Sequence, residues 1–252
     1  MRVFCAEMTD MNDPAPTFSP LYRQIKGSIM RSLESGEWRP GEAIPSEIEL
    51  AARYKVSQGT VRKAIDELAA EKHLLRRQGK GTFVVTHDEA RAQFRFLRLM
   101  PDQGEQEYPA SRLLDCKRAR AGAEIAHLLE LRTGDGLVII RRVLNIADEP
   151  TVFEQIYLPG ALFKNLSAAI FNEYKGSMYK LFETEFGTRM IRAEEKIRAV
   201  AADATVAELL LVSQGAPLLC VERVAFSYGD KPVEFRRGFY RTDKHYYRNE
   251  LG

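Results

Sequence analysis

The sequence has few cysteines and no long hydrophobic run. Cys5, Cys116 and Cys220 are odd in number, widely spaced and without a Cys-x-x-Cys pair, so neither a disulfide framework nor a zinc site is predicted. No stretch of about 18 apolar residues occurs, and acidic residues and prolines stand where a signal peptide needs an apolar segment. We therefore expect no membrane span, a cytoplasmic location and reduced thiols.

The motifs of common enzyme classes are also missing. The sequence contains no Gly-rich phosphate loop, no Gly-x-Ser-x-Gly and no His-Glu-x-x-His, and its four histidines are scattered. No nucleophile is accompanied by a base. We therefore predict no catalytic residue, no metal site and no cofactor.

The chain has an ordinary globular composition but an uneven distribution of charge. Of its 252 residues, 45% are hydrophobic and 29% charged, and the length leaves room for two domains. Residues 18–86 carry 12 Lys and Arg against 8 Asp and Glu, a charge of +4 within a total of +2. A basic N-terminal third beside a slightly acidic remainder favours one module for a polyanion and one for another ligand.

Local patterns in the N-terminal third predict three helices followed by a hairpin. Ser46 and Glu49 form a capping-box pattern, and Ser57 is placed to cap the next helix. A Gly-Lys-Gly turn separates two short apolar runs, as in a hairpin. This order is typical of a winged helix-turn-helix. The predicted segments are a helix within 20–38, helices at 47–54 and 58–72, and a hairpin at 73–85.

The helix at 58–72 has an apolar side and a polar side that suits DNA recognition. Arg62 is placed for a bidentate contact with guanine, and Lys63 for a phosphate. The alternative is that these charges form an ordinary solvated face, which is common for any single residue. The order of motifs favours DNA binding. The candidate DNA-binding residues are Ser46, Ser57, Gln58, Thr60, Arg62, Lys63, Arg77, Gln78, Gly79, Lys80 and Gly81.

The run PLYRQIKGSIM…PSEIELAARYKVSQGTVRKAIDEL…RRQGKGTFV resembles the N-terminal domain of the GntR family of bacterial transcription regulators. The resemblance implies that Thr60, Arg62 and the wing residues 78–81 contact DNA. Two positions differ from the family pattern, because Ile48 and Gln58 replace arginines. Glutamine prefers the edge of adenine to that of guanine. We therefore expect a palindromic operator with altered inner bases.

Beyond a polar linker predicted at 87–93, the pattern changes to mixed strands and helices. Gly229-Asp230 indicates a hairpin between the last two long strands. The pattern favours an α+β domain built on an antiparallel sheet. The predicted strands lie at 94–100, 113–120, 137–146, 151–159, 190–200, 217–228 and 231–241, and the predicted helices at 123–131, 175–186 and 204–211.

This second part resembles the UTRA effector-binding domain of the HutC subfamily, whose fold is like chorismate lyase. The resemblance is carried by RVLNIADEPTVFEQIYLPGALF, SMYKLFETEFG, IRAEEKIRA, GAPLLCVERVAFSYGDKPVEF and YRTDKHYY. It implies a ligand pocket and, in this family, a homodimer. The implied effector-binding residues are Arg142, Glu154, Ser177, Tyr179, Arg192, Glu222, Tyr228 and Tyr240.

Simpler interpretations exist for these pocket residues. For any single tyrosine, an ordinary core aromatic is the more common case. Arg142 and Glu222 lie among apolar strand neighbours and are candidates to pair with each other. Members that bind sugar phosphates have an Arg-x-Arg pattern, but here Leu144 occupies the second position, and Arg141 points to the opposite face from Arg142. A single pocket arginine suits a small anion, such as an organic acid, amino acid or sugar phosphate.

Together these patterns predict a two-domain regulator. The expected parts are a flexible tail at 1–17, a winged helix-turn-helix at 18–86, a linker at 87–93 and a UTRA domain at 94–252. We expect a dimeric repressor that binds a palindromic operator in double-stranded DNA and whose DNA affinity a small anionic effector modulates. The alternative is a lyase-like enzyme or metabolite-binding protein with an accessory DNA-binding domain, since chorismate-lyase-like folds include enzymes.

Overall fold

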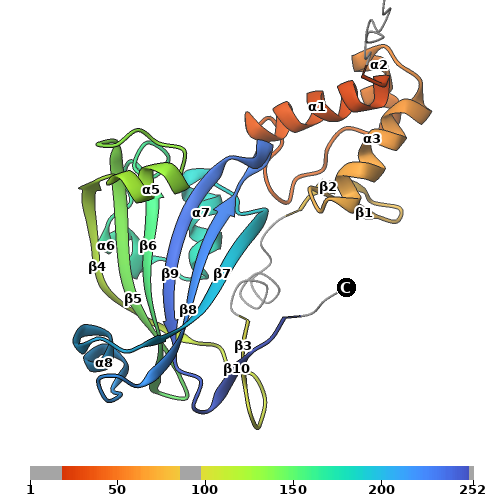
Figure 1. The fold of residues 1–252 in the computed structure, drawn as a ribbon. Coiled ribbons are helices and arrows are strands. Elements are labelled where there is room, and N and C mark those ends of the chain that lie inside the picture. Colours follow the sequence, from red (N-terminus) through yellow and green to blue (C-terminus); the bar gives the residue numbers. More distant parts are fainter. Residues whose placement is uncertain (1–18, 86–97, 250–252) are drawn as a thin grey trace, which may run out of the picture.

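A computed structural model describes residues 19–85 and 98–249, which form two modules (Figure 1). The predicted tail at 1–17 and the predicted linker at 87–93 lie outside the described residues. No helix in the two described segments is long and apolar enough to cross a bilayer.

The N-terminal module is a winged helix-turn-helix, as the sequence predicts. Its three helices pack around one apolar core, to which Ile29, Leu50 and Ile65 contribute fully buried side chains. The two strands pair antiparallel across the glycine turn. The elements are α1 (Leu21–Glu34), α2 (Glu47–Tyr54), α3 (Gln58–Ala70), β1 (Leu74–Arg77) and β2 (Gly81–Val84).

Local side-chain chemistry fixes where α2 and α3 begin. Ser46 accepts the backbone N–H of Glu49, and the Glu49 carboxylate accepts the backbone N–H of Ser46 at 2.8 Å, which completes the capping box. Ser57 Oγ accepts the backbone N–H of Thr60 at 3.2 Å. Each cap satisfies an amide that would otherwise lack a partner at the helix start.

The C-terminal module is an α+β domain built on a six-stranded antiparallel sheet in the order β4-β5-β6-β9-β8-β7. A second, two-stranded sheet pairs β10 with β3. The strands are β3 (Leu99–Pro101), β4 (Ala110–Arg120), β5 (Gly136–Ile146), β6 (Glu149–Pro159), β7 (Arg192–Ala201), β8 (Pro217–Phe226), β9 (Pro232–Tyr240) and β10 (His245–Tyr247). The helices are α5 (Ala123–Leu128), α6 (Ala168–Glu173), α7 (Met178–Phe186), α8 (Ala204–Leu210) and the 3₁₀ turn η1 (Tyr228–Asp230).

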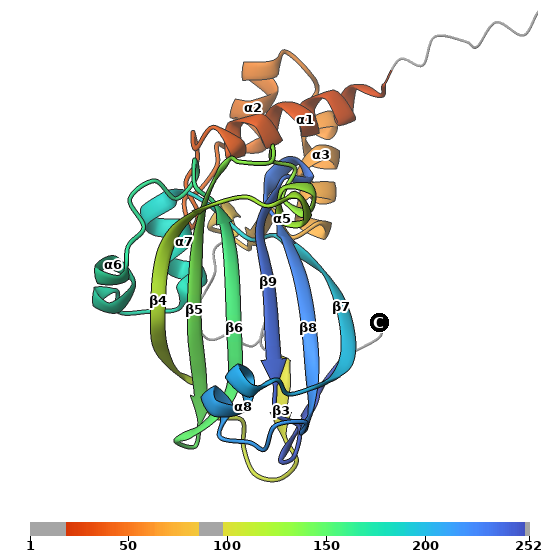
Figure 2. The ribbon, with the colours of Figure 1, turned by 60° about the vertical axis from the view of Figure 1, so that its left-hand side comes forward.

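The two faces of the large sheet pack against different elements. On what we call the inner face, Ile140 and Ile156 pack against α7, and farther along Leu144 and Val152 pack against the β3–β10 pair. On the opposite, outer face, α8 and α5 pack at different places, and Figure 2 shows both helices in front of the strands. A strip of the inner face therefore lies between the part that packs against α7 and the part that packs against the β3–β10 pair.

The sequence did not indicate two short elements. Helix α6 and strand β10 are six and three residues long, too short to show a clear period. Most of the strand predicted at 94–100 lies outside the described residues, and its described end begins β3. The other predicted strands and helices are present, with ends shifted by a few residues.

The two modules touch through the turn between β8 and β9. Tyr228 packs against the core of the N-terminal module, with its ring centroid 5.8 Å from that of His73. At Gly229, with φ +65°, an added Cβ would lie 2.9 Å from a carboxylate oxygen of Glu34 in α1. The turn therefore lies against α1 (Figure 1), and a side chain at position 229 would have to displace the flexible Glu34 carboxylate.

Candidate nucleic-acid interface and effector site

The start of α3 presents a polar surface to solvent. Ser57, Gln58, Arg62 and Lys63 are exposed, and Thr60 is half-buried. The buried side of the same helix carries Val61, Ala64, Ile65 and Leu68, which hold it against the core. The predicted division of α3 into a core side and a solvent side is confirmed.

The carboxylate of Glu47 organises this surface. Its Oε2 atom accepts hydrogen bonds from Arg62 Nε at 3.0 Å and from Gln58 Nε2 at 3.2 Å. Its Oε1 atom accepts a bond from Arg76 Nη2 at 2.8 Å, and Arg76 also donates to Asp66. One side chain in the first turn of α2 thereby joins α2, α3 and β1. These contacts were not predictable from the sequence, because they depend on how three elements pack.

The remaining predicted residues of this module lie around the same surface. Lys63 Nζ lies 4.0 Å from the centroid of the Tyr22 ring, and the Arg77 guanidinium lies over Phe83 at 4.7 Å. Ser46 is occupied by the capping box. The wing tip, which comprises Gln78, Gly79, Lys80 and Gly81, is exposed.

Two glycines shape the wing. Gly79 and Gly81 have φ values of +70° and +108°, in the region that only glycine adopts without strain. No other atom lies within 4 Å of the Cβ positions that side chains there would occupy. The turn conformation, and not crowding within the chain, therefore requires glycine at both positions.

Ile48 is an exposed apolar residue next to Glu47. It stands where the resembling family usually has arginine, and 68% of its surface is accessible. Isoleucine offers no hydrogen bond to phosphate. This part of the surface therefore lacks one of the family's usual cationic contacts.

The inner face of the sheet carries buried ionic groups in the strip beside α7. Glu154, 1% exposed, accepts Arg142 Nε at 2.7 Å and Arg236 Nη1 at 2.7 Å. Burial alone would raise the pKa of Glu154, but the two guanidiniums outweigh it and lower the pKa to about 2. Glu154 is therefore a carboxylate shared by two arginines.

Arg236 extends this network to α7. Its Nε donates to Glu234 Oε1 at 3.0 Å, and its Nη2 donates to the Tyr179 hydroxyl at 3.1 Å. Tyr179 in turn donates to Glu234 at 3.0 Å, and burial, as the main cause, raises the pKa of Tyr179 to about 12. The helix and the sheet are therefore joined by polar contacts within an apolar core.

A third buried arginine lies toward the edge of the sheet. Arg223 donates through Nε to Glu195 at 2.6 Å, and Glu195 also accepts the Tyr247 hydroxyl of β10. Glu195 and Tyr247 line a pocket of about 370 Å³ at β7, together with Arg192. The complete lining is Arg98, Arg192, Ala193, Glu195, Ile197, Tyr247 and Asn249.

Of the eight predicted effector residues, the structure brings four together on or against the inner face: Arg142, Glu154, Tyr179 and Tyr240. Gly238, opposite Glu154 in the register, leaves room for the Tyr240 ring, since an added Cβ would lie 2.6 Å from that ring. Arg192 lines the pocket at β7 instead. Ser177 caps α7 by accepting the backbone N–H of Lys180.

Two predicted residues lie elsewhere. Glu222 is on the outer face, where it accepts Arg198 and Arg237 at 2.7 and 2.9 Å, so its suggested pairing with Arg142 is wrong. Tyr228 lies at the contact between the modules and accepts a hydrogen bond from Arg189 at 3.1 Å. By contrast, the prediction that Arg141 points away from Arg142 is confirmed, because Arg141 pairs with Asp115.

Arg223, Glu234 and Arg236, which are all at most 4% exposed, were not predicted as site residues from the sequence. A weak indication was available, because charged residues stand among apolar ones in β8 and β9. Their presence did not show which face was covered. It became informative only once α7 was placed on the sheet.

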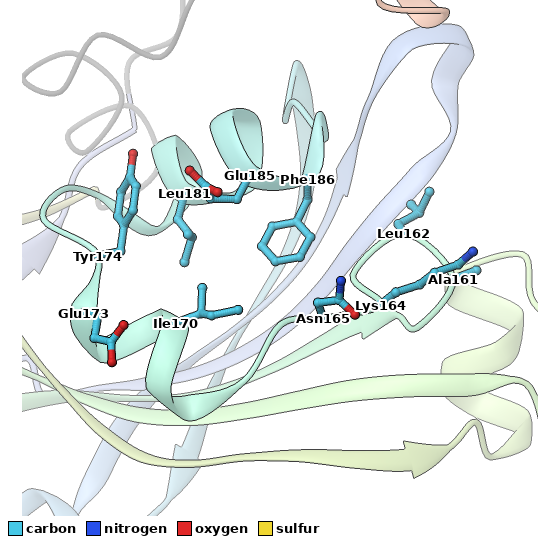
Figure 3. A pocket seen from close by; sticks show the side chains of 10 residues that line it. All are labelled: Ala161, Leu162, Lys164, Asn165, Ile170, Glu173, Tyr174, Leu181, Glu185 and Phe186. Atoms are coloured by element: carbon cyan, nitrogen blue, oxygen red, sulfur yellow. The ribbon is translucent and has the colours of Figure 1, made fainter.

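A larger pocket lies between α6 and α7 and is separate from these groups. Its volume is about 710 Å³, and its walls combine apolar side chains with charges of both signs (Figure 3). The lining residues are Ala161, Leu162, Lys164, Asn165, Ile170, Glu173, Tyr174, Leu181, Glu185 and Phe186. None of the predicted effector residues lines it. In the described residues, no group of three or more His, Cys, Asp and Glu is arranged to hold a metal ion.

Two family models match the chain. Residues 21–84 match the model of bacterial regulatory proteins of the gntR family, and residues 104–246 match the UTRA domain. The two matches fall on the two modules described above.

Individual relatives agree with these matches. A crystal structure of the ligand-binding domain of a Bordetella bronchiseptica protein assigned to the GntR-family transcriptional regulators is 50% identical and has a TM-score of 0.61; the match covers 64% of this chain and 99% of that one. The "Probable fructoselysine utilization operon transcriptional repressor" of Escherichia coli is 29% identical over 89% of this chain and 91% of its own length. The histidine utilization repressor of Pseudomonas putida is 26% identical, with 90% of both chains covered.

Proposed function

Because this chain belongs to the GntR family of bacterial regulatory proteins and carries a UTRA domain, we propose that it is a repressor whose operator binding is controlled by a small anionic metabolite. The family and the named relatives are transcription regulators, which favours this function over a lyase-like enzyme. The operator, the effector class and the dimer are parts of the proposal.

The proposed DNA contact is the exposed start of α3 together with the wing. A helix fits the major groove when its apolar side is held in a core and its outer side offers hydrogen-bond donors. Arg62 offers a guanidinium, and Gln58 offers an amide. The exposed Lys80 at the wing tip suits a phosphate or groove contact beside the recognition helix.

The single observation that carries the proposed effector site is the arrangement of Arg142 on the inner face. Glu154 holds Arg142 through Nε, and the Arg142 side chain keeps 10% of its surface accessible. A guanidinium anchored at Nε has its two terminal amines directed away from the anchor, in the fork that matches a carboxylate or a phosphate. We propose that this fork binds the anionic group of the effector.

A carboxylate is the anion that best suits this site. Leu144 replaces the second arginine that sugar-phosphate-binding members carry, so a doubly charged phosphate has one guanidinium fewer here. The two relatives named above are repressors named for the utilization of fructoselysine and of histidine, and both compounds carry a carboxylate. An amino acid or organic acid is therefore our first choice.

The proposed route of coupling is the β8–β9 turn. Arg223 and Arg236 lie on β8 and β9, the two strands that this turn joins, and Tyr228 within the turn packs on the N-terminal module. A ligand that changes the ion pairs on these strands would shift the turn against α1. In a homodimer, such a shift would change the spacing of two recognition helices in successive major grooves.

Neighbouring arginines on opposite faces of β5 provide a matched test of the effector site. Full-length protein and the variants Arg142→Gln and Arg141→Gln would be screened by thermal shift against amino acids, organic acids and sugar phosphates. Each stabilising compound would then be titrated into a complex with a selected DNA duplex. We expect a carboxylate to stabilise the wild type and Arg141→Gln, to change their DNA affinity, and to leave Arg142→Gln unaffected. Equal responses of the two variants would contradict the site.

A further inference from the structure

Glu47 is the most connected side chain on the proposed DNA-contacting surface. It lies in the first turn of α2, its side chain is 14% exposed, and it accepts hydrogen bonds from Gln58, Arg62 and Arg76. Two of these donors belong to the recognition helix and one to the wing strand. A single carboxylate therefore fixes the side chains that would face the bases.

The contact with Arg62 determines which of its atoms remain available. Glu47 takes the Nε–H of Arg62, at the base of the guanidinium, while 58% of the Arg62 side chain stays exposed. The two terminal amines are the atoms that form a bidentate contact with O6 and N7 of guanine. Glu47 therefore anchors Arg62 without using the atoms that recognise a base.

The contact with Gln58 sets the orientation of its amide. An ionised carboxylate can only accept hydrogen bonds, so the amide nitrogen of Gln58 must face Glu47, as the 3.2 Å contact shows. One N–H and the carbonyl oxygen of Gln58 remain available. This is the donor and acceptor pair that glutamine uses on N6 and N7 of adenine.

The surroundings of Glu47 keep it ionised. Partial burial would raise its pKa, but hydrogen bonds from Arg76, Arg62 and Gln58 outweigh that effect and lower the pKa. Glu47 is therefore an acceptor at neutral pH. Its negative charge opposes phosphate binding, which indicates that its contribution is to geometry and not to electrostatic attraction.

We propose that Glu47 is the positioning residue that sets base specificity, by holding Arg62 and Gln58 in the orientations that present their free hydrogen-bonding atoms to DNA. This inference rests on the proposed function, in which α3 contacts the operator. It goes further because it assigns specificity to a residue that does not itself touch a base.

The test compares Glu47→Gln with Glu67→Gln in the full-length protein. Glu67 lies in α3, where it pairs with Lys26 of α1 at 3.2 Å and shares no partner with Glu47. Each variant removes one negative charge, so any general gain in affinity for DNA is matched between them. Each protein would be used to select duplexes from a randomised pool, and its affinities for the wild-type motif and a scrambled duplex would be measured.

We expect Glu47→Gln to lose about tenfold or more in the ratio of motif to scrambled affinity, the equivalent of one good base contact. The loss should fall at the base positions that Arg62 and Gln58 recognise, and Glu67→Gln should keep both the motif and the ratio. In an Arg62→Ala background, Glu47→Gln should cause a smaller further loss. If the role of Glu47 were purely structural, Glu47→Gln would lower the affinity ratio by the same factor in the wild-type protein and in the Arg62→Ala variant.

The outcomes separate this inference from the proposed function. If the wild type selects no motif, the proposed DNA contact itself fails. If the wild type selects a motif and Glu47→Gln keeps its ratio within twofold, the role of Glu47 is refuted while the proposed function stands. Circular dichroism melting of each variant identifies a loss of folding, and Glu47→Asp, which keeps the charge, should recover part of the ratio in a folded protein.

Discussion

Arg142 on β5 and Glu154 on β6 lie opposite each other in the strand register and are joined by a 2.7 Å hydrogen bond from Nε to Oε2. Both residues are buried on the inner face of the sheet. A buried ion pair of this kind recovers its desolvation cost only when further hydrogen bonds complete it. Arg236 supplies such a bond to the second oxygen of Glu154, so the pair forms part of a network.

The network predicts an acid-sensitive contribution to stability. The pKa of Glu154 falls from 4.5 to about 2 on folding, so its contribution is fully present above pH 4.5 and is lost as the pH falls toward 2. That shift corresponds to roughly 3 kcal/mol, at about 1.4 kcal/mol per pKa unit.

Denaturant unfolding of Glu154→Gln measures this contribution. We expect a loss of about 3 kcal/mol or more in the free energy of unfolding at pH 7, and a gap from the wild type that narrows between pH 4.5 and pH 2. Glu149→Gln, which removes an exposed carboxylate paired with Lys244, should show no such gap. If the difference in the free energy of unfolding between the wild type and Glu154→Gln does not change with pH, the assigned ionisation of Glu154 is wrong.

Gln58→Arg should shift operator preference toward guanine. Arginine offers two donors to O6 and N7 of guanine, whereas glutamine matches adenine, and each bidentate contact discriminates by about 1–3 kcal/mol. The measurement is a selection from randomised duplexes with each protein. An unchanged motif would show that position 58 does not contact a base.

Ser57→Ala should destabilise the protein by about 1 kcal/mol, because the backbone N–H of Thr60 loses its cap. Thermal unfolding monitored by circular dichroism measures this loss. Ser28→Ala is a matched control, since Ser28 lies within α1 and bonds to the carbonyl of Gln24 without capping a helix. Equal losses in both variants would argue against the cap.

Tyr228→Ala should loosen the contact between the modules. The Tyr228 ring packs against the N-terminal core near His73, so its removal should expose the end of α1. Hydrogen–deuterium exchange of α1 should accelerate in this variant and remain unchanged in Tyr174→Ala, whose side chain lines the pocket between α6 and α7. Unaltered exchange in α1 would remove the turn from the proposed coupling route.

The N-terminal module was predictable because its indications are local. Ser46, Glu49 and Ser57 act within one helical turn, and the glycines that shape the wing act within one hairpin. The family match at residues 21–84 falls within the predicted segment 18–86. Glu47 was not predicted as a site residue, because its partners come from two other elements.

The effector site was less predictable because it depends on which face of each strand is covered. Glu222 and Arg223 are adjacent, so an error of one residue in assigning the inner face exchanges them. Apolar side chains flank the Glu222-Arg223 pair on both sides, and the pattern alone does not choose which of the two faces inward. The position of Tyr228 was not predictable, because it depends on how the two modules are placed relative to each other. Short-range sequence patterns do not contain that information.

The most direct test of the proposed function is selection of random duplex DNA by the full-length chain, followed by titration of the enriched duplex over a range of salt concentrations. We predict a motif of two inverted half-sites, spaced to suit two recognition helices about one helical turn of DNA apart. Affinity should fall steeply as the salt concentration rises. If the protein enriches no motif, or binds the enriched and scrambled duplexes with equal affinity, it does not recognise an operator in the way proposed.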